Sequence, residues 1–149
     1  MSNRRTTFEE EISQHGQLIY TNVGNSMIPL LRQGKDLLVI THKPEGRLNK
    51  YDVPLYKRDS GKYVLHRILK VRKDDYVIYG DNCWQMEYGI TDSHIIGVLS
   101  AVIRDGKTIP VTDRKYRIYV HLWCDFFFIR VAFLWLKALP RRIKRKLKQ

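Results

Sequence analysis

Two apolar runs, YVLHRILKV at residues 63–71 and YVIY at residues 76–79, decide the fold class. Val, Ile, Leu and Tyr dominate both runs, and the turn-forming segment Lys73-Asp74-Asp75 separates them, which is typical of two antiparallel strands joined by a hairpin. Alternation in the first run predicts that His66 shares a strand face with Val64 and Ile68, while Arg67 lies on the opposite face. We therefore expect one continuous strand over residues 63–71.

The same pattern extends from residue 17 to about residue 110. Further short apolar runs lie at residues 18–23, 37–41, 52–56 and 94–103, and turn-forming residues such as Asp59-Ser60-Gly61 and Asp105-Gly106 separate them. Strands of this spacing favour antiparallel hairpins that close into a β sandwich or coiled barrel. We predict a mainly β domain over residues 17–113, a short surface helix within residues 1–16, and a hydrophobic C-terminal helix with a basic tail within residues 114–149.

The composition excludes several classes of protein. The 149 residues are enough for one domain, and 44% hydrophobic with 28% charged residues is typical of a globular chain rather than a disordered one. Two cysteines cannot form a disulfide framework or a four-thiolate zinc site, and the histidines show no metal-ligand spacing, so we expect no metal and no cofactor. The first 16 residues hold no apolar run, so we expect neither a secretory signal nor a membrane anchor there.

The C-terminal region combines apolar and basic residues. Seven basic side chains and no acidic one lie in residues 137–149, which leaves +5 of the net charge of +12 for the first 136 residues. Residues 118–139 are long enough to span a bilayer. Their twelve Leu, Ile, Val and Phe side chains contribute about −4 to −7 kcal/mol to insertion, whereas Asp125 and Arg130 together cost about 5 to 7 kcal/mol.

This near-zero insertion energy favours a helix lying in the membrane interface, with residues 118–148 on anionic lipid. A single C-terminal span and simple packing of the helix on the β domain are the alternatives. Nucleic acid fits less well as a partner, because the basic groups are gathered at one end of the chain rather than over a face.

Three segments hold the candidate catalytic residues. Ser26 follows Gly24 on an expected tight turn, where a serine is also a common helix N-cap. His66, with an ordinary pKa of about 6.5, is a natural base for a hydroxyl at neutral pH, although a strand histidine is often only a hydrogen-bonded core residue. Asp81, in Gly80-Asp81-Asn82, can orient a histidine and stabilise its imidazolium, or can simply form a turn.

Taken together, these segments resemble the S24/S26 peptidase superfamily. The resemblance covers about residues 20–104 and includes, besides these three segments, Gly34-Lys35-Asp36, Lys50-Tyr51-Asp52-Val53 and Ile96-Gly97-Val98. His66 stands where many members carry a lysine, so the chain is similar to the Ser-His branch, the signal peptidases of archaeal, endoplasmic-reticulum and sporulation type.

The resemblance implies an antiparallel β fold that cleaves extended peptides after small residues by acyl transfer. Carried over, Ser26 is the nucleophile, His66 the general base and Asp81 the orienting acid. Glu87 is the alternative third group, because relatives carry a second carboxylate a few positions after Gly-Asp-Asn. We thus expect a serine endopeptidase that acts on signal or leader peptides of exported proteins, and an extended peptide or preprotein as its partner.

The alternative to an enzyme is a non-catalytic regulatory or membrane-binding module on the same fold, contacting nucleic acid through residues 141–148. A repressor of this kind needs a helix-turn-helix, for which the roughly 16 residues before Leu18 are too few. We expect a membrane-associated protein, peripheral or with one C-terminal span, in a bacterial cell and with its cytoplasmic face favoured.

Overall fold

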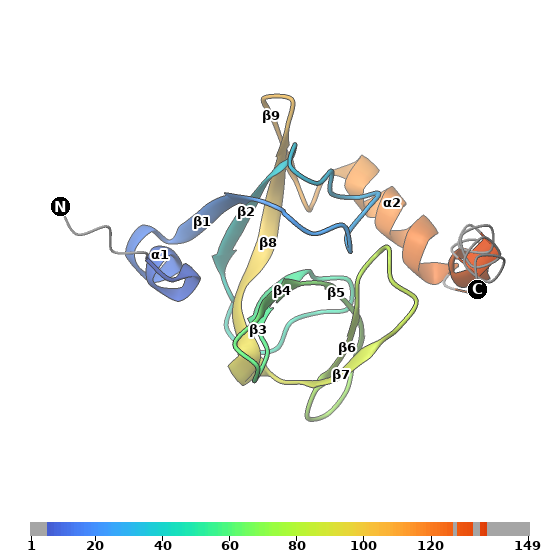
Figure 1. The fold of residues 1–149 in the computed structure, drawn as a ribbon, viewed down its shortest axis with the longest axis horizontal. Coiled ribbons are helices and arrows are strands. Elements are labelled where there is room, and N and C mark those ends of the chain that lie inside the picture. Colours follow the sequence, from blue (N-terminus) through green and yellow to red (C-terminus); the bar gives the residue numbers. More distant parts are fainter. Residues whose placement is uncertain (1–5, 127, 133–134, 137–149) are drawn as a thin grey trace, which may run out of the picture.

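The computed structural model describes residues 6–126, 128–132 and 135–136 (Figure 1). The chain order of the elements is α1 (Phe8–His15), β1 (Gln17–Thr21), β2 (Leu37–His42), β3 (Pro54–Lys57), β4 (Tyr63–Leu65), β5 (Arg67–Val71), β6 (Tyr76–Tyr79), β7 (Glu87–Ile90), η1 (Asp92–His94), β8 (Ile95–Arg104), β9 (Lys107–Pro110) and α2 (Arg114–Asp125).

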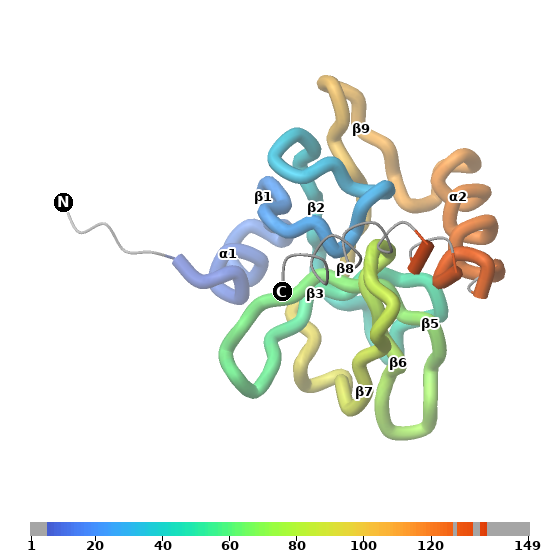
Figure 2. The backbone as a smooth tube through the Cα atoms, turned by 45° about the vertical axis from the view of Figure 1, so that its right-hand side comes forward, coloured from blue at the N-terminus to red at the C-terminus, as the bar shows by residue number. Residues whose placement is uncertain are grey.

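The strands of the described residues form two antiparallel sheets. The larger sheet has the order β1-β2-β8-β3-β4, with β9 paired to β8, and the smaller sheet has the order β5-β6-β7. The long strand β8 joins the two halves of the larger sheet by pairing with both β2 and β3. Figures 1 and 2 show that β3 to β7 curl around one end of β8, with α1 and α2 on opposite sides. The prediction of a mainly β, antiparallel fold is confirmed.

The short N-terminal helix is also confirmed. The Thr7 hydroxyl accepts a hydrogen bond from the Glu10 backbone N–H, and the Glu10 carboxylate accepts one from the Thr7 N–H, so that two otherwise unpaired helix donors are satisfied. Gly16, at φ 74°, ends the helix in the left-handed conformation. Ile12 anchors α1 in the core with 1% of its surface exposed.

The predicted continuous strand over residues 63–71 is wrong, because the strand breaks at His66. β4 pairs with β3 in the larger sheet, whereas β5 pairs with β6 in the smaller one. His66 therefore lies at the point where the chain passes from one sheet to the other. β7 and β9 were not expected from the sequence, since both are short and lack an alternating apolar pattern.

The C-terminal helix α2 starts four residues before the expected apolar stretch. The Asp113 carboxylate caps it by accepting hydrogen bonds from the backbone N–H groups of Lys115 and Tyr116, at 2.8 and 3.1 Å. Its inner face is buried in the larger hydrophobic core through Tyr116, Val120 and Cys124. Part of the predicted 118–139 helix (127, 133–134 and 137–139) lies outside the described residues. Within the described part, no helix combines the length and the apolar character needed to cross a bilayer.

Candidate functional site

Ser26 lies on a turn that its neighbours stabilise. After β1, the Asn22 side chain accepts a hydrogen bond from the Gly24 N–H at 3.2 Å and donates one to the Gly24 carbonyl at 2.9 Å. Ser26 itself is half-buried, and the next residue, Met27, is fully buried in the larger core. Residues 26–30 form turns rather than a helix, so Ser26 is not a helix N-cap.

The Gly80-Asp81-Asn82 segment packs directly against Ser26. The Asn82 backbone N–H donates to the Ser26 carbonyl at 2.7 Å, and the Asn82 side-chain amide donates to the Asn25 carbonyl at 3.2 Å. A Cβ at Gly80 would lie 2.7 Å from the Ser26 carbonyl oxygen and 3.0 Å from its Cβ, so only glycine fits there. Two of the three segments predicted for the site are therefore in contact.

His66 faces a tyrosine and a glutamate. Its side chain is 13% exposed, and its Nδ1 lies 3.3 Å from the Tyr56 hydroxyl and 3.9 Å from the nearer Glu87 carboxylate oxygen. The Tyr56 hydroxyl donates a hydrogen bond to the same Glu87 oxygen at 2.7 Å. Burial lowers the pKa of His66 to about 4, although the Glu87 charge acts in the opposite direction. The ring is therefore neutral at pH 7.

Arg58 fixes Glu87 in this position. Its guanidinium donates two hydrogen bonds, from Nε to one carboxylate oxygen at 2.7 Å and from Nη2 to the other at 2.6 Å. Burial raises the pKa of Glu87, but the hydrogen bonds from Arg58 and Tyr56 outweigh burial and leave the pKa below its ordinary value. Glu87 is thus a fixed, ionised carboxylate beside His66.

Asp81, the predicted orienting acid, is engaged elsewhere. Arg67 donates from Nε to one Asp81 oxygen and from Nη2 to the other, both at 2.9 Å, and both side chains are completely buried. The Tyr119 hydroxyl donates to the second oxygen at 3.1 Å. Among the described residues, no hydrogen bond links Asp81 to His66. The geometry therefore points away from the prediction for Asp81 and toward the alternative, Glu87.

The Ser26 hydroxyl and the His66 ring make no direct hydrogen bond within the described part of the chain. The sequence did indicate Ser26, His66 and Glu87, but not Tyr56 or Arg58. These two residues stand on and next to β3, where nothing in their sequence context distinguishes them from ordinary strand residues.

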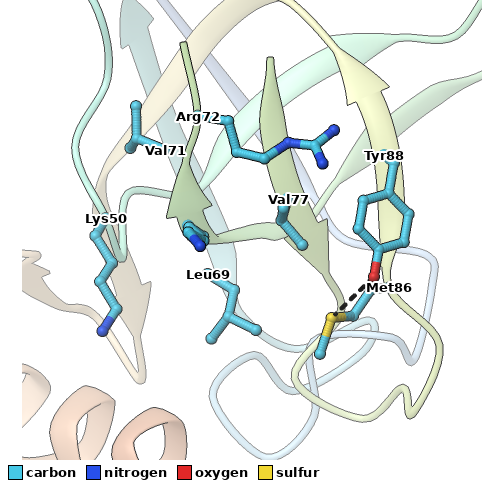
Figure 3. Close-up of a pocket in the computed structure, with 8 residues that line it drawn as sticks. Lys50, Leu69, Val71, Arg72, Val77, Met86 and Tyr88 are labelled. Carbon is cyan, nitrogen blue, oxygen red and sulfur yellow. Dashed lines mark hydrogen bonds between the residues drawn. The ribbon is translucent and has the colours of Figure 1, made fainter. Parts of the chain in front are cut away.

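An open groove of about 780 Å³ lies over the smaller sheet (Figure 3). Leu69, Val77 and Met86 give it an apolar floor, and the Tyr88 hydroxyl lies 3.6 Å from the Met86 sulfur. Lys50 and Arg72 also line it and are labelled in Figure 3. Met86 and Tyr88 line the groove, whereas Glu87 between them does not, and neither Ser26 nor His66 lies along it. Among the described residues, no three His, Cys, Asp or Glu side chains are grouped so that they could hold a metal ion.

Comparison of the chain with models of protein families, with curated proteins and with solved structures finds no match.

Proposed function

We propose that the chain is a serine endopeptidase of the signal-peptidase type, with Ser26 as nucleophile and His66 as general base. The observation that carries the proposal is the series from His66 Nδ1 through the Tyr56 hydroxyl to Glu87. The Tyr56 hydroxyl donates a hydrogen bond to Glu87, so its oxygen can accept a hydrogen bond from Nδ1–H of His66. Nε2 of the neutral ring then carries the free lone pair that can take a proton. Glu87, rather than Asp81, then stabilises the imidazolium.

The chemistry is acyl transfer to serine. Nε2 of His66 takes the Ser26 proton as Oγ bonds to the scissile carbonyl carbon, and backbone N–H groups of the Ser26 turn hold the oxyanion. The imidazolium then gives its proton to the leaving amine as the C–N bond breaks, and water hydrolyses the acyl-enzyme by the reverse sequence of proton transfers. General-base assistance and an oxyanion donor each contribute about 10² to 10³ or more in rate.

The sheet edge at β4 suits an extended substrate. β4 is the last strand of the larger sheet and ends at Leu65, one residue before His66. A peptide that adds to this edge by main-chain hydrogen bonds would extend along β4 toward His66, the proposed base. An extended segment of a preprotein, such as a signal or leader peptide with a small residue before the scissile bond, is the substrate we propose.

A serine-directed fluorophosphonate tests the proposal without knowledge of the substrate. Ser26 Oγ should displace fluoride from phosphorus, and peptide mass spectrometry should find the adduct on the peptide that contains Ser26. Ser60, in an exposed turn, is the matched control and should stay unmodified. An absent adduct, or equal labelling of Ser60, would contradict the proposal and would favour the alternative, a non-catalytic module on the same fold.

We also propose that the protein associates with the cytoplasmic face of a membrane through the outer face of α2. Ile118, Leu122 and Phe126 are four residues apart, lie opposite the buried face of the helix and are all exposed. Exposed Arg114, Lys115 and Arg117 lie in the first turns of the same helix. The sequence after Asp125 contains no acidic residue. An apolar row flanked by cations fits an anionic bilayer surface.

Ile118→Asp should weaken binding to vesicles of phosphatidylcholine and phosphatidylglycerol by about tenfold or more, because an apolar side chain that enters the bilayer is replaced by a charge. Co-sedimentation measures the partition coefficient. Ile19→Asp is the matched control, since Ile19 on β1 is 48% exposed and Ile118 is 49% exposed. Equal partitioning of the two variants, or no binding of the unmodified protein, would rule out this membrane face.

A further inference from the structure

The inner face of α2 contacts Asp81, in the Gly80-Asp81-Asn82 turn that packs against Ser26. The indole Nε1–H of Trp123 donates to the backbone carbonyl of Asp81 at 2.9 Å, and the Tyr119 hydroxyl donates to the Asp81 carboxylate at 3.1 Å. The Trp123 ring stacks on the Tyr119 ring, with centroids 6.0 Å apart. Arg130, beyond the end of α2, donates to the same Asp81 carbonyl at 3.0 Å. The C-terminal region thus holds both the backbone and the side chain of Asp81.

The residues on either side of Asp81 are the ones that touch Ser26. Gly80 has no room for even a methyl group against the Ser26 backbone, and the Asn82 N–H bonds to the Ser26 carbonyl at 2.7 Å. If Asp81 moves, the segment around Ser26 must therefore move too, because no free space separates the two segments. Such tightly packed contacts transmit a displacement instead of damping it.

We propose that Trp123 and Tyr119 are positioning residues for the nucleophile, acting through the Gly80-Asp81-Asn82 turn. The inference rests on the proposed function, in which Ser26 reacts. Neither residue touches the reacting atoms: each fixes Asp81, and Asp81 fixes the neighbours that seat Ser26. The C-terminal helix is then part of the catalytic apparatus rather than only a membrane contact.

The two faces of α2 can be separated experimentally. The outer row, Ile118, Leu122 and Phe126, does not contact Asp81, whereas Trp123 and Tyr119 do. Substitution of Trp123 or Tyr119, the two α2 residues that bond to Asp81, should therefore change the reactivity of Ser26. Truncation of the chain before α2 would remove both properties together, so single substitutions in the full chain are the informative ones.

Trp123→Phe keeps an aromatic ring but removes the N–H donor to Asp81. We expect it to slow the labelling of Ser26 by a fluorophosphonate by about tenfold to a hundredfold, because a small misplacement of a reacting group has effects of that size. Tyr119→Phe, which removes one hydroxyl, should slow labelling in the same direction. Tyr20→Phe is its matched control, since the Tyr20 ring packs against Phe8 on α1 and, among the described residues, no hydrogen bond joins Tyr20 to Asp81.

Val120→Ala separates positioning from general loss of stability. Val120 is 4% exposed on the same helix, and its loss creates a cavity in the larger core. Unfolding midpoints and labelling rates are measured for all variants under native conditions. The inference is supported if Trp123→Phe labels slowly while Val120→Ala, although less stable, labels at the unmodified rate.

The inference is overturned if Trp123→Phe labels at the unmodified rate, or if Val120→Ala and Trp123→Phe lose rate in proportion to their loss of stability. The midpoint of the pH dependence should be the same in Trp123→Phe and the unmodified protein, because Trp123 does not contact His66. If the unmodified protein does not label at all, the proposed function fails and the inference fails with it. This result is distinguishable from the outcomes above, in which the unmodified protein is labelled.

Discussion

His66→Ala is expected to slow the labelling of Ser26 by about 10² to 10⁴, because it removes the base that takes the serine proton. Ser26→Ala should give no labelling at all and sets the baseline. His42→Ala is the matched control, since His42 is an exposed histidine at the end of β2. The rate constant of adduct formation, measured by intact-protein mass spectrometry, provides the comparison. Equal rates for His66→Ala and His42→Ala would remove His66 from the mechanism.

The pH dependence of the same reaction reports on the burial of His66. Burial lowers the pKa of the ring to about 4, so the ring stays neutral and able to accept a proton until the pH falls toward that value. We expect the labelling rate at pH 5 to remain close to its value at pH 7. A histidine with the ordinary pKa of about 6.5 would lose most of its base form by pH 5. A midpoint near pH 6.5 would therefore contradict the buried environment described for His66.

Asp81→Asn is expected to have the largest effect on stability. The substitution leaves the guanidinium of Arg67 fully buried without its carboxylate, and breaking a buried ion pair in this way costs about 3 to 5 kcal/mol. The free energy of unfolding, from denaturant titration, measures the loss. Asp59→Asn is the control, because the Asp59 side chain is 96% exposed.

Glu87→Gln should lower the free energy of unfolding much less than Asp81→Asn does. Its ion pair with Arg58 is partly exposed, so its loss should destabilise the fold by only about 1 kcal/mol. Labelling of Ser26 should nevertheless slow, because the imidazolium of His66 loses its carboxylate. If Glu87→Gln labelled at the unmodified rate, the assignment of Glu87 as the group that stabilises the imidazolium would be wrong.

The sequence predicted the fold class from local patterns. The runs at residues 37–41 and 76–79 match β2 and β6 closely, because apolar β-branched and aromatic residues bounded by turn residues leave few alternatives. The break at His66 could not be predicted, since it depends on which partner strands flank the chain before and after this residue. The same is true of β7, whose position is set by pairing with β6 rather than by its own pattern.

The candidate site could be predicted only in part. The motif around Gly80 identified a segment that does contact Ser26, because only glycine fits where two backbones approach so closely, and a glycine is visible in the sequence. The role of Asp81 could not be predicted in the same way, since only the folded chain shows that Arg67, the residue after His66, binds the Asp81 carboxylate. The contacts of Trp123 and Tyr119 join residues about 40 positions apart and have no local signal.

A crystal structure of the protein after reaction with a fluorophosphonate would show whether His66 reaches the reacting oxygen of Ser26. We predict phosphorus bonded to Ser26 Oγ, with Nε2 of His66 within hydrogen-bonding distance, about 3 Å, of Oγ or of an adduct oxygen. If the adduct forms on Ser26 but the His66 ring lies farther away than a single bridging water can reach, His66 is not the base. If no adduct forms in a folded protein, Ser26 is not the nucleophile.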